Sequence, residues 1–112
     1  MQIATARLRL REFGACDWQA VRAYQSDARY LRFYEWTQRT EEDARAFVDR
    51  FIGWQNERPR TKFQLAIELR GQLIGNGGVR ITNAATREAE IGYELDPQQW
   101  GNGYATEAAR AM

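Results

Sequence analysis

The feature that most constrains this sequence is a strand that leads through a glycine-spaced loop into a helix. Alternating residues predict a strand over Glu88–Leu95. Asp96-Pro97 ends that strand, because proline cannot donate a hydrogen bond to a sheet and restricts the residue before it. Gly101 and Gly103 allow backbone conformations, and a close approach, that a β-carbon would block. Residues 106–111 have high helix propensity, so a strand end and a helix N-terminus are expected to meet at this loop.

The loop is expected to present a row of unpaired backbone N–H groups. The amides from Gly101 to Thr106 stand at the start of the helix, where the first N–H groups have no partner within the helix. The positive end of the helix attracts anions, so these amides can hold a phosphate without a lysine, and a diphosphate is a natural occupant. A plain strand–turn–helix is the alternative, because Gly-x-Gly pairs are common in turns.

The whole sequence predicts an α/β (α+β) fold with a mixed, mostly antiparallel sheet. Gly71-Gln72 lies between two alternating segments, which predicts a hairpin. Gly75, Gly77 and Gly78 in its second arm predict a bulge or a close backbone approach. The expected elements, in the order strand, helix, helix, strand, strand, strand, helix, are a strand over Thr5–Phe13, a short helix capped by Asp17, a helix from Thr40 to near Arg58, strands over Lys62–Leu69, Leu73–Thr82 and Glu88–Leu95, and the helix from Tyr104.

Composition indicates one globular domain over residues 1–112. The chain is 44% hydrophobic and 28% charged. A formal net charge of +1 gives no electrostatic reason to expect nucleic acid or an acidic membrane as a partner. No apolar run approaches the roughly 20 residues needed to cross a bilayer, and the first residues do not form a signal peptide.

The numbers of cysteines and histidines restrict the chemistry. Cys16 is the only cysteine, so no intrachain disulfide forms, which fits a cytoplasmic location. The absence of histidine excludes Ser-His-Asp triads, histidine bases and histidine zinc sites, and no metal is expected. Acid–base chemistry must therefore come from carboxylates, tyrosines, lysine or water.

Three segments together resemble the GNAT family of N-acetyltransferases, within it the branch of ribosomal-protein N-terminal alanine acetyltransferases and their small-molecule relatives. The family loop begins with Gln or Arg, followed after two residues by Gly-x-Gly or Gly-x-Ala. Here the window is Trp100-Gly101-Asn102-Gly103-Tyr104-Ala105, with Trp100 in place of the usual Gln or Arg. Ala89–Leu95 resembles the branch's fourth strand, and Thr5–Arg11 resembles its opening strand. The resemblance covers essentially all 112 residues.

The resemblance implies acetyl transfer from acetyl-CoA to a primary amine, on a protein N-terminus or a small molecule. A CoA-binding or protein-interaction module without catalysis is the alternative. In this family the pantetheine arm lies beside the fourth strand like an added strand, here along Tyr93, Glu94 and Leu95. The pyrophosphate is expected on the loop amides, which belong to Gly101, Asn102, Gly103, Tyr104, Ala105 and Thr106.

Removing a proton from the attacking amine requires a carboxylate or an ordered water. The resemblance makes Glu90 the first choice for this general base and Glu94 the second. The two-residue repeat of a strand puts Glu90, Gly92 and Glu94 on one face. The alternative for either glutamate is a solvated residue or a salt-bridge partner.

Two further groups have both a functional and a structural interpretation. The row Arg7, Arg9 and Arg11 can attract a phosphate or an acidic acceptor, and a solvated strand face is the simpler interpretation. Four aromatic residues can line an acceptor cleft or pack within the fold; they are Tyr30, Phe33, Tyr34 and Trp36.

The family fold continues beyond the helix that starts at Tyr104. The resemblance implies a fifth strand, another helix, a final pair of strands, and a tyrosine that protonates the departing thiolate. None of these is present in 112 residues. We therefore expect an incomplete acetyltransferase domain, the N-terminal part of the GNAT fold in a longer enzyme. The alternative is a short protein that completes its sheet as a homodimer through an open edge.

Overall fold

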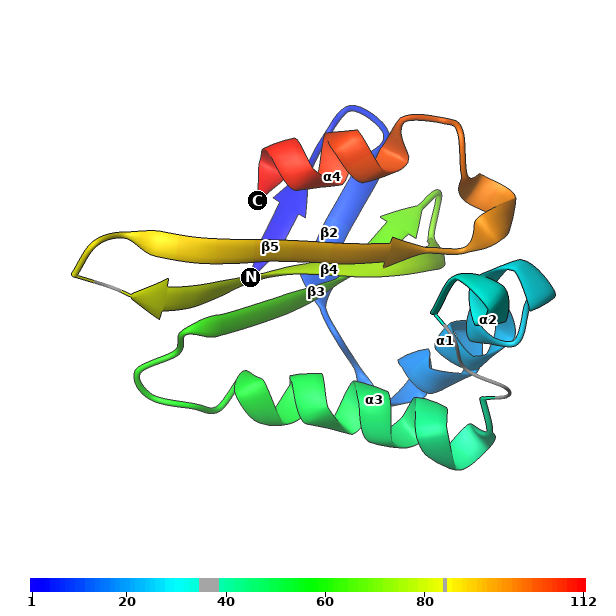
Figure 1. Ribbon diagram of the computed structural model, residues 1–112, viewed down its shortest axis with the longest axis horizontal. Helices are drawn as coiled ribbons and strands as arrows, with labels where there is room; N and C mark the ends of the chain where they lie inside the picture. The colour runs from blue at the N-terminus through cyan, green and yellow to red at the C-terminus, as the bar shows by residue number, and fades with distance from the viewer. Residues whose placement is uncertain (35–38, 84) are drawn as a thin grey trace.

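The computed structural model describes residues 1–34, 39–83 and 85–112, and contains a five-stranded sheet in the order β1-β2-β3-β4-β5 (Figure 1). Each neighbouring pair of these strands is antiparallel. Helices α1 and α3 cover one face of the sheet and α4 lies on the other (Figure 1). No helix in the described ranges is long and apolar enough to span a membrane. The predicted α/β fold is confirmed.

The elements follow the predicted order, with one further strand, one further helix and two 3-10 turns. The strands are β1 (Gln2–Ala4), β2 (Leu8–Glu12), β3 (Lys62–Leu69), β4 (Gln72–Asn83) and β5 (Glu88–Leu95). The helices are α1 (Trp18–Gln25), α2 (Ala28–Tyr34), α3 (Glu41–Trp54) and α4 (Tyr104–Ala111), with 3-10 turns η1 (Ala15–Asp17) and η2 (Pro97–Gln99).

The predicted single strand over Thr5–Phe13 was wrong, because β1 and β2 form a hairpin. The Thr5 amide donates to the Leu8 carbonyl over 2.9 Å, and the Leu8 amide donates to the Thr5 hydroxyl over 3.0 Å. Such side-chain bonds to nearby backbone compete with an extended strand. The hairpin turn brings Thr5 and Arg7 to the edge of the sheet near α4.

Helix α2 was not predicted, and α3 is shorter than predicted. The amide of Arg29 donates to Asp27 over 2.8 Å at the start of α2, a capping bond that the aromatic pattern did not reveal. Helix α3 begins after Thr40 as predicted, because Thr40 and Asp43 form a reciprocal capping box. It ends at Trp54 because the next three amides bond to carbonyls three residues back, as in a 3-10 turn.

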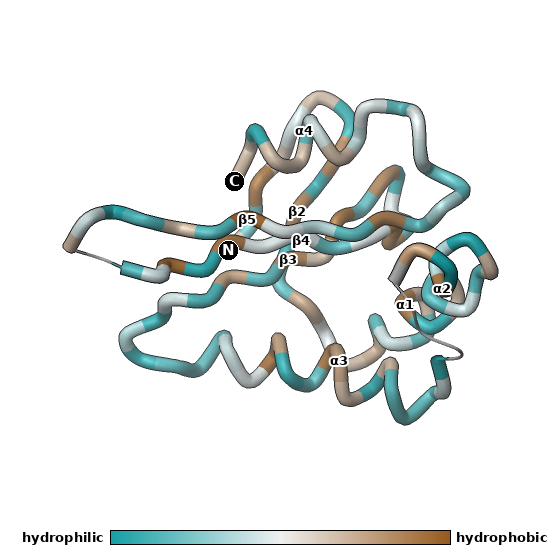
Figure 2. The backbone as a smooth tube through the Cα atoms, viewed as in Figure 1, coloured by the Kyte–Doolittle hydropathy of each residue, from teal (hydrophilic) through white to brown (hydrophobic). Residues whose placement is uncertain are grey.

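The sheet separates two hydrophobic cores. Alternate residues of β3 point to opposite faces, so Leu65 and Ile67 face α4 while Ala66 faces α1 and α3. Figure 2 shows hydrophobic segments on the inner strands and hydrophilic ones toward the loops. The core on the α4 side contains Leu8, Leu10, Leu65, Ile67, Ile74, Leu95 and Ala108. The other contains Phe13, Val21, Tyr24, Tyr30, Ala44, Val48, Phe51, Ala66 and Leu73.

The glycines of β4 allow close approach to the neighbouring strands, as predicted. A Cβ added at Gly75 would lie 2.2 Å from the Glu94 carbonyl oxygen. One added at Gly78 would lie 2.4 Å from the Phe63 carbonyl oxygen. Real Cβ atoms do not approach backbone so closely, so a larger residue at Gly75 would push β5 away from the sheet. The position of the Glu94 backbone thus depends on this glycine.

Candidate active site

The glycine-spaced loop connects the end of β5 to α4 through η2 (Figure 1). Asp96 accepts a hydrogen bond from the Gln98 amide over 2.9 Å, which starts η2. Gly101 and Gly103 have φ of 84° and 79°, in the left-handed region that favours glycine. Gly103 is the residue before the first turn of α4. The loop therefore adopts the predicted arrangement of a strand end facing a helix N-terminus.

The loop amides are free to bind a ligand. Within the described ranges, no acceptor is present for the N–H groups from Gly101 to Thr106. The Glu107 amide is the first to bond back into the loop, to the Gly103 carbonyl over 3.0 Å. A row of unpaired N–H groups at a helix start is a binding site for an anion.

Trp100, which stands where the family loop usually has Gln or Arg, forms a hydrogen bond with the end of β5. Its indole N–H donates to the Leu95 carbonyl over 3.2 Å. Its ring also lies edge-on to the ring of Phe33, with centroids 6.1 Å apart. Phe33, one of the aromatic residues of the predicted cleft, therefore contacts the glycine-spaced loop through Trp100 while remaining 71% exposed. Trp36 and the side chain of Tyr34 lie outside the described residues.

The outer edge of β5 is free of any described strand at the three residues predicted to hold pantetheine, and its Leu95 carbonyl accepts from the Trp100 indole. Tyr93, Glu94 and Leu95 pair with β4 on the inner side. No described strand pairs with the other edge. An extended ligand can add to such an edge as a further strand, through backbone hydrogen bonds.

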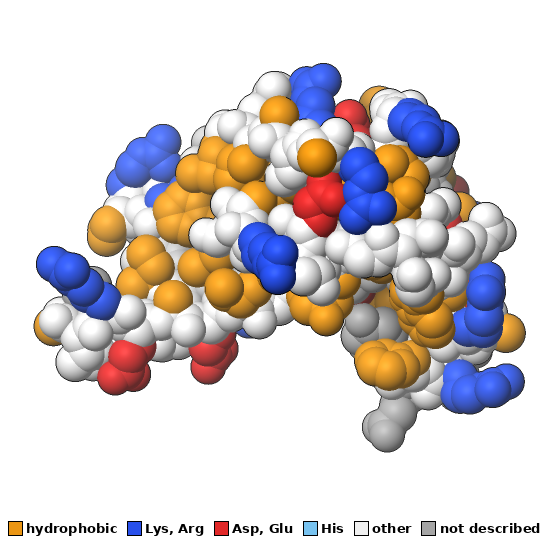
Figure 3. All heavy atoms as spheres, turned by 90° about the horizontal axis from the view of Figure 1, so that it is seen from above, with side chains coloured by type: hydrophobic (Ala, Val, Ile, Leu, Met, Phe, Trp, Pro, Cys, Tyr) orange, Lys and Arg blue, Asp and Glu red, His pale blue; other side chains and the backbone are white. Residues whose placement is uncertain are grey.

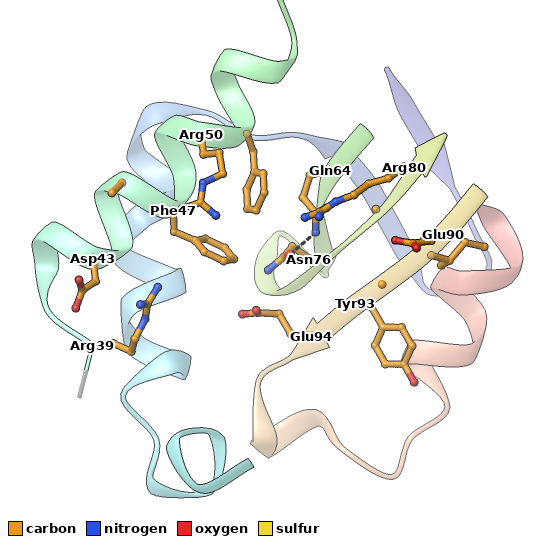
Figure 4. Close-up of a pocket in the computed structure, with 15 residues that line it drawn as sticks. Arg39, Asp43, Phe47, Arg50, Gln64, Asn76, Arg80, Glu90, Tyr93 and Glu94 are labelled. Carbon is orange, nitrogen blue, oxygen red and sulfur yellow. Dashed lines mark hydrogen bonds between the residues drawn. The ribbon is translucent and has the colours of Figure 1, made fainter. Parts of the chain in front are cut away.

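A cavity of about 520 Å³ lies between α3 and strands β4 and β5, on the side of the sheet away from α4 (Figure 4). Both predicted catalytic carboxylates, Glu90 and Glu94, line it together with residues of β4 and α3. Figure 4 shows Tyr93 directed away from Glu94, as strand alternation requires. The other charged lining residues are Arg39, Asp43, Arg50 and Arg80.

Glu94 is half-buried and accepts three hydrogen bonds. The donors are the Tyr24 hydroxyl at 2.6 Å, the Gln25 side-chain amide at 2.9 Å and the Tyr30 hydroxyl at 3.3 Å. Burial raises the pKa of Glu94, and the three hydrogen bonds partly offset that rise because they stabilise the carboxylate. A carboxyl group whose pKa is raised by burial accepts a proton more readily than a solvated one, so Glu94 is suited to act as a general base.

A second set of hydrogen bonds fixes the donors themselves. The Tyr24 hydroxyl accepts from the buried Asn76 side chain over 2.8 Å, so its own proton is directed to Glu94. The Asn76 side-chain oxygen Oδ1 in turn accepts from the Gln64 side-chain amide over 2.6 Å (Figure 4). Burial and the charge of Glu94 raise the pKa of Tyr24 well above its usual value, so Tyr24 remains a donor. Every described buried side-chain N and O atom has a partner.

The sequence did not identify Tyr24, Gln25 or Asn76 as site residues. Asn76 is 1% exposed and Gln25 is fully buried. A polar side chain on an apolar face is the signal that could have indicated them, because buried polar groups require partners. The strand register places Asn76 directly beside Glu94.

Glu90 lies in a different environment of the same cavity. It is exposed and lies opposite Arg80 in the pairing of β4 and β5. Among the described residues, none forms a hydrogen bond or ion pair with the Glu90 carboxylate. Glu90 and Glu94 therefore share a cavity and a face of β5, and only Glu94 is held by neighbouring side chains.

Comparisons with known proteins agree with this arrangement. The family model of the acetyltransferase (GNAT) domain matches residues 7–112. The uncharacterized N-acetyltransferase YnaD of Bacillus subtilis is 38% identical over all of this chain, which spans 63% of YnaD. A GNAT-family acetyltransferase from Bacillus anthracis has a TM-score of 0.78 at 32% identity, over 99% of this chain and 63% of its own.

A more distant structure shows the same fold. The microcin C7 self-immunity acetyltransferase MccE, solved in complex with acetyl-CoA and AMP, has a TM-score of 0.78 at 20% identity, over 96% of this chain and 61% of its own. This chain thus spans a little over three fifths of the proteins it matches. The chain belongs to the GNAT family of acetyltransferases.

Proposed function

We propose that this chain is the acetyl-CoA-binding part of an N-acetyltransferase that acetylates a primary amine, on a protein N-terminus or a small molecule. The observation that carries the proposal is the row of free amides at the start of α4 beside the open edge of β5. The pyrophosphate binds the amides of Gly101 to Thr106. The pantetheine arm follows the backbone of Tyr93, Glu94 and Leu95 as an added strand.

In the reaction, the amine nitrogen attacks the thioester carbonyl carbon, a C–N bond forms and the C–S bond breaks. The nitrogen loses one proton and the CoA thiolate gains one. We assign the proton from nitrogen to Glu94, because it lines the cavity with a raised pKa and a fixed orientation. Glu90, the first choice from the sequence, stays the alternative acceptor because it lines the same cavity.

The test of cofactor binding compares two glycines with the same backbone conformation. Gly103 and Gly71 have φ of 79° and 78°, and Gly71 lies in the β3–β4 turn outside the cofactor loop. Valine at either position strains the backbone. Acetyl-CoA at 100 times its Kd should stabilise the parent protein by about 2.7 kcal/mol. Gly71→Val should retain the resulting rise in melting temperature, and Gly103→Val should lose it.

Two results would count against cofactor binding at this loop. One is a parent protein whose melting temperature does not respond to acetyl-CoA. The other is a Gly103→Val protein that responds as strongly as Gly71→Val.

A cytoplasmic location belongs to the same proposal, and a homodimer through the open sheet edge is the alternative to a longer enzyme. Cys16 is exposed and free, which fits a reducing compartment. The open edge of β5 can take an edge strand of a second copy. Because pantetheine would occupy the same edge, CoA should dissociate such a dimer. Sedimentation velocity with and without CoA measures this, and a dimer unaffected by saturating CoA would exclude pairing through β5.

A further inference from the structure

The arginine row at the start of the chain is not a uniform solvated face. Arg11 pairs with Asp17 over 2.8 Å and also with Glu68. Arg9 is exposed, on the face of β2 opposite Leu8 and Leu10. Arg7 lies in the turn before β2 and reaches the loop and helix at the other end of the sequence.

We propose that Arg7 and Glu107 form a latch that holds the cofactor loop in its anion-binding shape. Arg7 is a positioning residue in this role, and the inference rests on the proposed binding of acetyl-CoA at the loop. It adds a function for the N-terminal hairpin, which lies about 100 residues before α4 in the sequence.

Both oxygens of the Glu107 carboxylate are fixed by the hairpin turn. Arg7 Nε donates to Oε1 over 2.7 Å, and the Arg7 amide donates to Oε2 over 2.9 Å. The Thr5 hydroxyl also donates to Oε2. These three donors lower the pKa of Glu107 to about 2, so the carboxylate is charged at any physiological pH. The first turn of α4 is therefore anchored to the sheet by charge-assisted hydrogen bonds.

The same guanidinium fixes the peptide between the two loop glycines. Arg7 Nη1 donates to the Asn102 carbonyl over 3.0 Å, and the guanidinium lies 4.5 Å from the centre of the Tyr104 ring. In a planar trans peptide the C=O and the following N–H point in opposite directions. Holding the Asn102 carbonyl toward Arg7 therefore directs the Gly103 N–H away from Arg7, and this N–H is one of the free donors.

Arg7 also removes an electrostatic conflict. Glu107 lies in the first turn of α4, close to where a bound diphosphate would place its negative charge. A carboxylate there favours the helix and repels an anionic ligand. The Arg7 guanidinium pairs with the Glu107 carboxylate, so the two groups together carry no net negative charge beside the anion site. Loss of Arg7 would therefore both free the loop and expose the charge of Glu107.

The test is Arg7→Gln in the complete protein, titrated with CoA and, separately, with pantetheine, which lacks the phosphates. Affinity for CoA should fall about tenfold, the scale of one lost charge-assisted hydrogen bond. Affinity for pantetheine should stay unchanged, because it binds along β5. Arg9→Gln is the matched control and should leave both affinities at the parent values.

A merely structural role predicts a different pattern. An equal loss for CoA and pantetheine, or no loss for CoA, would overturn the latch. Arg7→Lys is a second variant should the glutamine protein not fold; it keeps the charge but not the forked geometry, and a CoA affinity equal to that of the parent would also overturn the proposal. A parent protein that binds no CoA would instead overturn the proposed function.

Discussion

The two faces of β5 are built in different ways. Toward α4, Leu95 is buried in an apolar core, and Tyr93 and Ile91 are each 54% exposed. Figure 3, seen from above, shows hydrophobic side chains gathered on this side of the sheet, where residues outside β5, among them Ile3, Leu65 and Met112, line an apolar cavity of about 280 Å³. Toward α3, the face carries Glu90 and Glu94.

The difference separates two tasks of the proposed enzyme. The cofactor loop offers backbone N–H groups, so its function depends on glycine and on the shape that the latch maintains. The cavity beside α3 is lined by side chains such as Glu90 and Glu94. Its proposed function depends on which side chains these are and on whether they are protonated. Substitutions on the two sides should therefore affect different measured quantities.

The largest expected effect is on the rate. Glu94→Gln should lower kcat by about 10²-fold to 10⁴-fold, the scale of general base catalysis. Affinity for CoA should be unchanged, because glutamine leaves the backbone of β5 and the loop in place. Steady-state kinetics with an accepted amine, together with a CoA titration, measures both. A larger loss in Glu90→Gln than in Glu94→Gln would transfer the role of base to Glu90.

A smaller effect is expected from Tyr24→Phe, which removes one donor to Glu94. The hydrogen bond from Tyr24 lowers the pKa of Glu94, so its loss should raise that pKa and move the acid limb of the kcat/KM profile to higher pH. The substitution also removes the hydroxyl that accepts from the Asn76 side chain. The buried donor left without a partner should lower the free energy of unfolding by about 1–3 kcal/mol. A pH–rate profile and urea unfolding test this. An acid limb that stays in place would contradict Glu94 as the base.

The smallest expected effect is on the stability of the folded protein at acid pH. As the pH falls, Glu107 and Glu94 change this stability in opposite directions. Glu107 has a lowered folded pKa, so its stabilisation is complete above the ordinary value of 4.5 and is lost as pH falls toward about 2. Glu94 has a raised folded pKa, so its protonation gains stability as pH falls through that value toward 4.5.

Melting temperatures of Glu107→Gln and Glu94→Gln across pH 2–7 test these opposite signs. Below about pH 4.5 the stability of Glu107→Gln should fall less steeply than that of the parent. Glu94→Gln should instead lose part of the rise in stability that the parent shows as pH falls toward 4.5. The comparison fails if both variants change the profile in the same direction.

The sequence predicted those parts of the fold that depend on local pattern. Alternation in Lys62–Leu69 and the capping box at Thr40 act over a few residues, so both could be identified. The alternation of Thr5–Phe13 hid a turn, because the Thr5 side chain bonds to backbone only three residues away. Helix α2 buries Tyr30 yet exposes Phe33, so the aromatic residues showed no helical period.

The sequence indicated the conformation of the glycine-spaced loop more completely than the side chains of the cavity. The loop is one continuous segment, and Gly101 and Gly103 adopt the positive φ that favours glycine. Tyr24 and Gln25 reach Glu94 across about 70 residues of sequence, and Arg7 reaches Glu107 across 100. Only strand register and helix packing bring these residues together, and no local pattern encodes either.

The buried Tyr24 hydroxyl offers a way to follow the candidate base directly. Its proton is held between Tyr24 and Glu94, and Tyr24 is 3% exposed to solvent, so the proton should exchange slowly with water. A hydroxyl proton with these properties gives a separate, downfield-shifted signal in a proton NMR spectrum. Its chemical shift during a pH titration would report the ionisation of Glu94 in the folded protein, without any acceptor amine.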